Sequence, residues 1–196
     1  SIAGFTTTGT VTMSKSGSTT ATFTGAVSGG SLAISGGSNG STLALGSFTH
    51  TFTGGWAMNS GALQGGTSTL KVAGNVTGGG TNFTPGTGTV ELYGANQTFV
   101  DLNFYNLLFS GTAGAVKTFP NTAVAISNNL IINTGIVADL NNISSVTHTA
   151  KTLTLGGIIR GSGIWGSTSS TALNTNNTYF SATAGKVNVT STATCT

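Results

Sequence analysis

The amino-acid sequence predicts an all-β protein, and among all-β folds it favours a β-solenoid. Over many short segments, apolar residues alternate with Thr, Ser or Ala, which is the pattern of a half-buried strand. Gly, Asn and Ser separate these segments about every 8 to 12 residues, a spacing typical of all-β domains. No stretch combines good helix formers at the helical period. A nine-residue phrase, GTSTLKVAG at 66–74, returns almost unchanged as GTGTVELYG at 86–94.

The alternating pattern predicts strands along the whole chain. In order, they lie at 10–14, 21–25, 31–35, 42–46, 48–52, 69–74, 89–94, 123–127, 130–133, 152–157 and 186–190. Most of the 31 glycines lie between these segments, where their access to positive φ allows sharp corners. The chain is therefore expected to turn often and tightly.

The repeat is direct, and its period of about 20 residues is typical of a β-solenoid. In that fold each coil contributes a strand similar to that of the coil before it. At roughly 22 residues per coil, about nine coils are expected. The alternative is an antiparallel β-sandwich or jelly roll, which has the same strand spacing. Against it, Asn-Gly, the strongest signal for a tight hairpin, occurs only at Asn39-Gly40. Residues 1–196 are expected to form one β-rich domain, with a soft boundary near 80–86 between two merged repeat blocks.

The alternation also assigns the two faces of the repeated strands. Val72, Leu92 and Leu155 are expected to point into the core, and Lys71 and Glu91 to point outward, because successive strand residues face opposite sides.

Charge is scarce, with only 5% Asp, Glu, Lys and Arg and a net charge of +3. The basic residues are far apart in the sequence, which is unlike the clustered basic face of a nucleic-acid-binding protein. They are expected to be separate, solvated charges: Lys15, Lys71, Lys117, Lys151, Arg160 and Lys186. No run of about 20 apolar residues occurs, so no membrane span is predicted.

The sequence offers no set of residues for catalysis, and the chain is expected not to be an enzyme. The three acids, Glu91, Asp101 and Asp139, are scattered and are interpreted as isolated surface charges. His50 and His148 each lie between two threonines and are expected to point outward in a polar row. No G-x-S-x-G elbow or Walker lysine accompanies the abundant Ser and Gly. Neither a metal nor another cofactor is predicted.

Most of the chain resembles modules of very large secreted bacterial surface proteins with filamentous-haemagglutinin-like, adhesin-type repeats. The resemblance rests on GGWAMNSGALQGGTSTLKVAGNVTGGG, on FTPGTGTVELYGANQTF and NFYNLLFSGTAGAVKTF, and most specifically on WGSTSSTALNTNNTYF at 165–180. It implies export, a β-solenoid-like fold and a role in surface structure or adhesion, without catalytic residues. The chain departs from the family's phrasing at Ile158, Ile159 and Arg160, where small or polar residues are more usual.

These observations together predict an extracellular structural or adhesive protein, a subunit or module of a surface fibre joined through its β-strand ends. Its partners would be other copies of itself or the rest of a longer repeat protein, because uncharged edge strands recruit other strands. Candidate inter-subunit strands contain Ile2 and Phe5 at one end and Val187 and Val189 at the other. Cys195, the single cysteine, is a candidate for an inter-chain disulfide.

The alternative function is a glycan-binding module of a secreted adhesin, which would need exposed aromatic side chains. The candidates are Trp56, Tyr93, Tyr105, Trp165 and Tyr179. Asn-x-Ser/Thr sequences also mark candidate glycosylation sites. They lie at Asn39, Asn75, Asn96, Asn142, Asn176 and Asn188.

Overall fold

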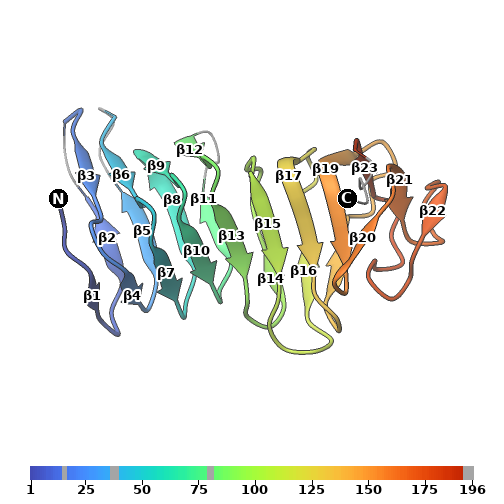
Figure 1. The fold of residues 1–196 in the computed structure, drawn as a ribbon, viewed down its shortest axis with the longest axis horizontal. Helices are drawn as coiled ribbons and strands as arrows, with labels where there is room; N and C mark the ends of the chain where they lie inside the picture. Colours follow the sequence, from blue (N-terminus) through green and yellow to red (C-terminus); the bar gives the residue numbers. More distant parts are fainter. Residues whose placement is uncertain (15–16, 36–39, 79–81, 192–196) are drawn as a thin grey trace.

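The computed structural model describes residues 1–14, 17–35, 40–78 and 82–191, and it shows an all-β solenoid of about seven turns. The coils stack along the long axis of the molecule, from the first coil to a C-terminal part in which the strands change direction (Figure 1). In the described part of the chain, no helix has the length and apolarity needed to cross a membrane. The predicted fold class is confirmed, and the sandwich alternative is wrong because neighbouring strands are mostly parallel.

One sheet, here called the long sheet, runs the length of the solenoid. Its main path, in spatial order, is β1 (Phe5–Thr6), β4 (Val27–Gly29), β7 (Thr49–Phe52), β10 (Thr69–Val72), β13 (Thr89–Leu92), β15 (Asn106–Phe109), β17 (Ala125–Ile132), β19 (Thr147–Leu155), β23 (Lys186–Val189), β21 (Gly163–Gly166) and β22 (Asn174–Thr175). A further strand, β20 (Ile158–Arg160), pairs with β19 off this path.

Three shorter sheets close the other sides of the coils. The second sheet contains β2 (Val11–Met13), β5 (Leu32–Ser35), β8 (Trp56–Ser60) and β11 (Val76–Gly78). The third contains β3 (Thr20–Thr22), β6 (Thr42–Ala44), β9 (Ala62–Gln64) and β12 (Phe83–Thr84). The fourth contains β14 (Gln97–Thr98), β16 (Val116–Thr118) and β18 (Val137–Asp139). The first coils are therefore three-sided.

The repeated phrase forms neighbouring strands of the long sheet. β10 and β13 pair in parallel, so that Lys71 lies opposite Glu91 and Val72 opposite Leu92. The glycine that begins each copy turns the corner before the strand with a positive φ, 60° at Gly66 and 61° at Gly86. A Cβ on Gly86 would collide with the carbonyl oxygen of Gly66 directly beneath it, so this corner needs glycine.

The number of coils is smaller than the sequence suggests. Coil length varies, because Thr89 aligns with Asn106, 17 residues on, whereas Leu107 aligns with Leu130, 23 residues on. The expected nine coils are wrong mainly because residues 156–185 do not continue the stack. This segment, here called the C-terminal cap, contains the strands β20 and β21, which pair antiparallel to β19 and β23.

The core is one continuous apolar column inside the coils. Val72, Leu92 and Leu155 are buried in it, as the alternation predicts, whereas Lys71 and Glu91 point to the outer face of the long sheet. Aromatic rings follow one another along the column at edge-to-face or tilted angles. The run comprises Trp56, Phe83, Phe104, Phe99, Phe109 and Phe119.

The cross-section changes in the middle of the chain. The second sheet ends with β11 and the third with β12, and the fourth begins at β14. The long sheet and the apolar column continue through this point. The coils before and after this change in cross-section therefore share one core.

Candidate functional site

Within the described residues, the first coil presents open strand edges on two sides of the solenoid, at β1 and β2. β1, β2 and β3 are the end strands of the long, second and third sheets, but the outer edge of β3 is partly covered, because the Thr22 carbonyl oxygen accepts from the Ile2 N–H. Ile2 forms a parallel bridge with Phe23 and is 39% exposed, and Phe5 is 38% exposed. Phe5 also packs edge-to-face on Phe23, with ring centroids 6.3 Å apart. This face combines unpaired backbone groups with accessible apolar side chains.

The opposite end has a different construction. β23, which holds Val187 and Val189, pairs with β19 on one edge and with β21 on the other. Both valines are buried, so this strand has no free edge to offer a second chain. Of the predicted end strands, only the one that holds Ile2 and Phe5 is open. Cys195 lies outside the described residues.

Exposed large apolar side chains occur only near the two ends of the described structure. Ile2 and Phe5 lie in the first coil, and the others lie in the C-terminal cap. Ile158 and Ile159, which depart from the family pattern, are 59% and 55% exposed on β20, and Leu173 is 92% exposed before β22. The sides of the rod are instead lined by small, polar and hydroxyl-bearing residues.

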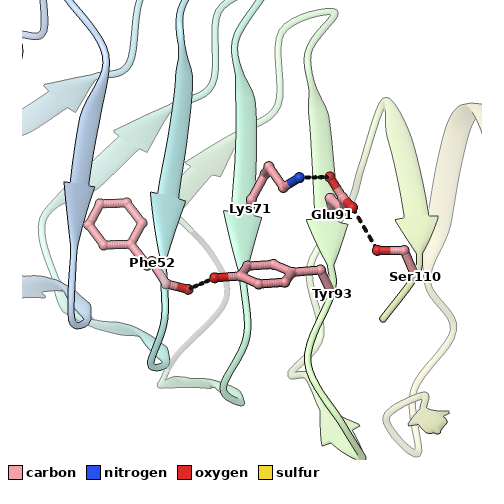
Figure 2. A network of polar contacts seen from close by, with 5 residues as sticks. All are labelled: Phe52, Lys71, Glu91, Tyr93 and Ser110. Carbon is pink, nitrogen blue, oxygen red and sulfur yellow. Dashed lines mark hydrogen bonds and ion pairs between the residues drawn. The ribbon is translucent and has the colours of Figure 1, made fainter. Parts of the chain in front are cut away.

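A polar network crosses four neighbouring strands on the outer face of the long sheet (Figure 2). Glu91 Oε2 lies 3.1 Å from Lys71 Nζ, and Glu91 Oε1 accepts a hydrogen bond of 2.6 Å from Ser110 Oγ. The Tyr93 hydroxyl donates to the carbonyl oxygen of Phe52 at 3.1 Å, and Lys71 Nζ lies 5.5 Å from the centre of the Tyr93 ring. Glu91 is thus not the isolated surface acid that the sequence suggests, because stacking brings its partners beside it.

A shallow groove of about 350 Å³ lies along the second sheet, across the first to the fourth coils. Its lining is mostly small and hydroxyl-bearing: Thr10, Ser31, Ala33, Gly55, Ala57, Asn75 and Thr77, with parts of Leu32 and Trp56. The Trp56 side chain is fully buried, so it cannot present its ring to a ligand in solution. Tyr93, Tyr105, Trp165 and Tyr179 remain partly accessible.

The prediction that both histidines point outward is wrong. His50 and His148 are fully buried in the apolar column, because alternation in THTF and THTA places histidine on the same face as Phe52 and Ala150. Each ring lies beside a phenylalanine, Phe23 for His50 and Phe119 for His148. The apolar residue two positions after each histidine is the sequence signal that identifies this face.

Lys117 is likewise not a solvated charge. It is fully buried, and its Nζ donates to the carbonyl oxygens of Gly94 and Ala95 at 2.7 and 2.8 Å and to Gln97 Oε1 at 2.5 Å. Gln97, directly opposite on β14, donates through Nε2 to the carbonyl oxygens of Val72 and Gly74. Burial lowers the pKa of Lys117 to about 8. The network joins three successive coils at the point where the cross-section changes.

The sequence does not indicate that Lys117 is buried, because its neighbours on β16, Val116 and Thr118, are typical of a half-exposed strand. Lys15, another of the predicted solvated charges, lies outside the described residues.

Several candidate glycosylation sites lie at coil corners, where the asparagine side chain also bonds to the next coil. Asn75 Oδ1 accepts from the Thr98 N–H and Asn96 Oδ1 from the Val116 N–H, each at 2.9 Å. Asn142 Oδ1 accepts from the Ala184 N–H at 3.2 Å, and all three asparagines are exposed.

The other candidate asparagines differ in place. Asn176 is half-buried and accepts from the Thr178 N–H in a local turn. Asn188 lies on β23 between two paired strands, and Asn39 lies outside the described residues.

Within the described ranges, no group of three or more His, Cys, Asp or Glu side chains could hold a metal ion. The chain matches no protein-family model, no curated protein and no solved structure. The fold is nevertheless that of a β-helix-type repeat module, which is the architecture that the adhesin resemblance implies.

Proposed function

We propose that the protein is an extracellular structural module of a surface fibre or adhesin, joined through its first coil to another β-solenoid coil. The observation that carries this proposal is the pair of open parallel edges on β1 and β2, beside the edge of β3 that Ile2 covers in part. Exposed edges recruit further strands unless charge, proline or a covering segment blocks them, and the described residues of these three strands carry no charge.

The partner surface follows from the direction of the strands. β1, β2 and β3 belong to parallel sheets, so a coil that precedes them in a longer repeat protein would continue the same parallel pairing. Another copy, whose open predicted end is also its first coil, would instead pair head to head and antiparallel. Ile2 and Phe5 would then be covered, which adds apolar burial to the main-chain hydrogen bonds.

Blocking the open edge without disturbing the coil tests this proposal. The Phe5 N–H donates to Ala26 and the Thr7 N–H to Ser28, so alternation directs the Thr6 N–H away from β4 toward the open edge. Thr6→Pro removes that donor, whereas Thr6→Val keeps it and serves as the matched control. We expect the parent and Thr6→Val to associate with rising concentration in light scattering and to form dimers, because β23 is paired on both edges and leaves the first coil as the open predicted end.

Thr6→Pro should remain monomeric while keeping the β-type circular dichroism spectrum of the parent. Assembly between copies is overturned if the parent stays monomeric at high concentration, and the role of the β1 edge is overturned if Thr6→Pro associates as the parent does.

The second candidate function is glycan binding at the groove on the second sheet. It is favoured by the volume of the groove and by the polar groups of Ser31, Asn75 and Thr77 in its lining. Titration calorimetry with oligosaccharides would show binding that Thr77→Ala weakens. Binding unchanged by this substitution would place any glycan elsewhere.

A further inference from the structure

The two buried histidines occupy matched positions in two distant coils. His50 Nδ1 accepts a hydrogen bond of 3.2 Å from the backbone N–H of Val27 in the coil before it. His148 Nδ1 accepts one of 3.1 Å from the backbone N–H of Val124, also in the preceding coil. Each histidine therefore fastens one coil to its neighbour through an imidazole nitrogen.

The other ring nitrogen of each histidine faces a carbonyl oxygen. His50 Nε2 lies 2.8 Å from the oxygen of Leu45, and His148 Nε2 lies 3.3 Å from that of Leu140. Because Nδ1 accepts and Nε2 faces an acceptor, both rings fit the neutral tautomer protonated at Nε2. A second proton would place an N–H at Nδ1 against the backbone N–H that it now accepts.

Histidine is an unusual choice at these inward positions. On the neighbouring strand β10, the residue aligned with His50 is Leu70, and the residue aligned with His148 on β23 is Val187. Both aliphatic residues are buried in the same column. An aliphatic side chain is enough to fill the core at these positions. Unlike an aliphatic side chain, an imidazole can accept a backbone N–H and can be protonated.

No charged side chain compensates a proton on His50 among the described residues packed against it. Its neighbours are Phe23, Val27, Leu45 and Leu70, and the nearest lysine on β10, Lys71, points outward to Glu91.

The surroundings of His148 are similar. Lys186 on β23 donates outward to Ser144 and Thr171, away from the imidazole. Lys117, two residues before Phe119, donates instead to the turn from Gly94 to Gln97. The Asp139 carboxylate, next to Leu140, accepts from the Asn141 N–H, and Lys151 on β19 is exposed.

We propose that His50 and His148 are two acid-sensitive latches, each holding one coil to the coil before it, so that mild acidification loosens the solenoid. In a repeat fold, neighbouring coils carry most of the stability, so each latch acts mainly on its own part of the rod. The protein then responds to acidity, a property separate from assembly through the first coil.

Burial lowers the pKa of both histidines from the ordinary 6.5, to about 4 for His148, although the bond to a backbone carbonyl opposes the change. In the unfolded chain both histidines take up protons near pH 6.5, whereas the folded chain resists protonation. Stability is therefore present above pH 6.5 and is lost as the pH falls from there toward 4.

The test measures the equilibrium constant of unfolding, from urea titrations, at pH 6 and pH 5. For an unfolded pKa near 6.5 and a folded pKa of about 4, His148 raises this constant roughly sevenfold over that step, and His50 adds a rise in the same direction. His50→Asn and His148→Asn keep an oxygen that can accept the backbone N–H but do not titrate. His50→Asn should keep roughly the sevenfold step of His148, His148→Asn should keep the rise due to His50, and the double variant should show almost none.

Leu70→Ala is the matched control, because it weakens the same inward ladder without removing a titrating group. It should be less stable at both pH values and keep the parent's step. The protection factors of the Val27 and Val124 amides in the parent should fall between pH 6 and pH 5, which locates the loosening at the latches.

Imidazole ¹⁵N shifts of the parent provide a measurement that needs no variant. They should show the Nε2–H tautomer at neutral pH and no protonation of the folded chain at pH 6. A parent without a step between pH 6 and 5, a double variant that keeps it, or histidines already protonated at pH 6 would each overturn the proposal.

Discussion

Lys71 and Glu91 form an ion pair of 3.1 Å between residues that occupy the same place in two copies of one repeated phrase. Because the coils stack in parallel, equivalent residues of successive copies of the repeat lie side by side on adjacent strands. Opposite charges that are 20 residues apart in the sequence are therefore neighbours in the structure. Ser110, on the next coil, completes the coordination of the carboxylate (Figure 2).

The outward ion pair should matter less for stability than the inward residue beside it. Lys71→Ala should lower the free energy of unfolding by about 0.5 kcal/mol or less, because the pair is partly exposed and Ser110 still serves Glu91. Val72→Ala should cost ~1–3 kcal/mol, because it opens space in the core. Urea denaturation compares the two variants, and equal losses would mean that the faces of β10 are assigned wrongly.

The glycine corner of the repeat should not tolerate a side chain. Gly86→Ala adds the strain of a positive φ, ~1–2 kcal/mol, to a collision with the backbone of Gly66. Gly114→Ala has a positive φ of 83° but open space around it, and Gly161→Ala meets neither obstacle. The thermal midpoint should fall most for Gly86→Ala, less for Gly114→Ala and hardly at all for Gly161→Ala. A different order would contradict close stacking at this corner.

The buried lysine should be required for the joint between the coils on either side of the change in cross-section. Lys117→Met keeps the length of the side chain but leaves the oxygens of Gly94 and Ala95 without this donor, and Gln97 Oε1 with the Gly94 N–H alone. We expect a loss of ~2 kcal/mol in urea denaturation, because partly buried acceptors would lack partners. Lys151→Met, at an exposed position of β19, is the matched control and should change stability by less than about 0.5 kcal/mol. Equal effects would mean that the Lys117 contacts contribute nothing net.

Glycosylation, in a host that has the machinery, should follow the accessibility of the acceptor asparagines. Asn75, Asn96 and Asn142 are exposed at coil corners, whereas Asn188 lies within a strand that is paired on both edges. Mass spectrometry of the protein from such a host should find glycans on the first three and none on Asn188.

Asn96→Asp is the control for structure, because it removes the glycan acceptor but keeps an oxygen for the Val116 N–H. Its folding should match that of the parent. Modification of Asn188 in folded protein would contradict the placement of β23.

Local alternation and the period of the repeat are enough to predict the strand class, the facing of the repeated strands and the alignment of their two copies, as Val72, Lys71 and Gly66 illustrate. The same alternation determines the facing of His50, because Phe52 two positions later lies on the same face of the strand.

The other features depend on contacts between distant parts of the chain. Lys117 is buried because the turn from Gly94 to Gln97, one coil earlier, supplies its acceptors, and nothing near it in the sequence indicates this. Val187 and Val189 read like an open end strand, yet β21 folds back antiparallel and covers their outer edge. Such contacts join residues that are far apart in sequence, and their geometry depends on how coils of unequal length stack, which local periodicity does not encode.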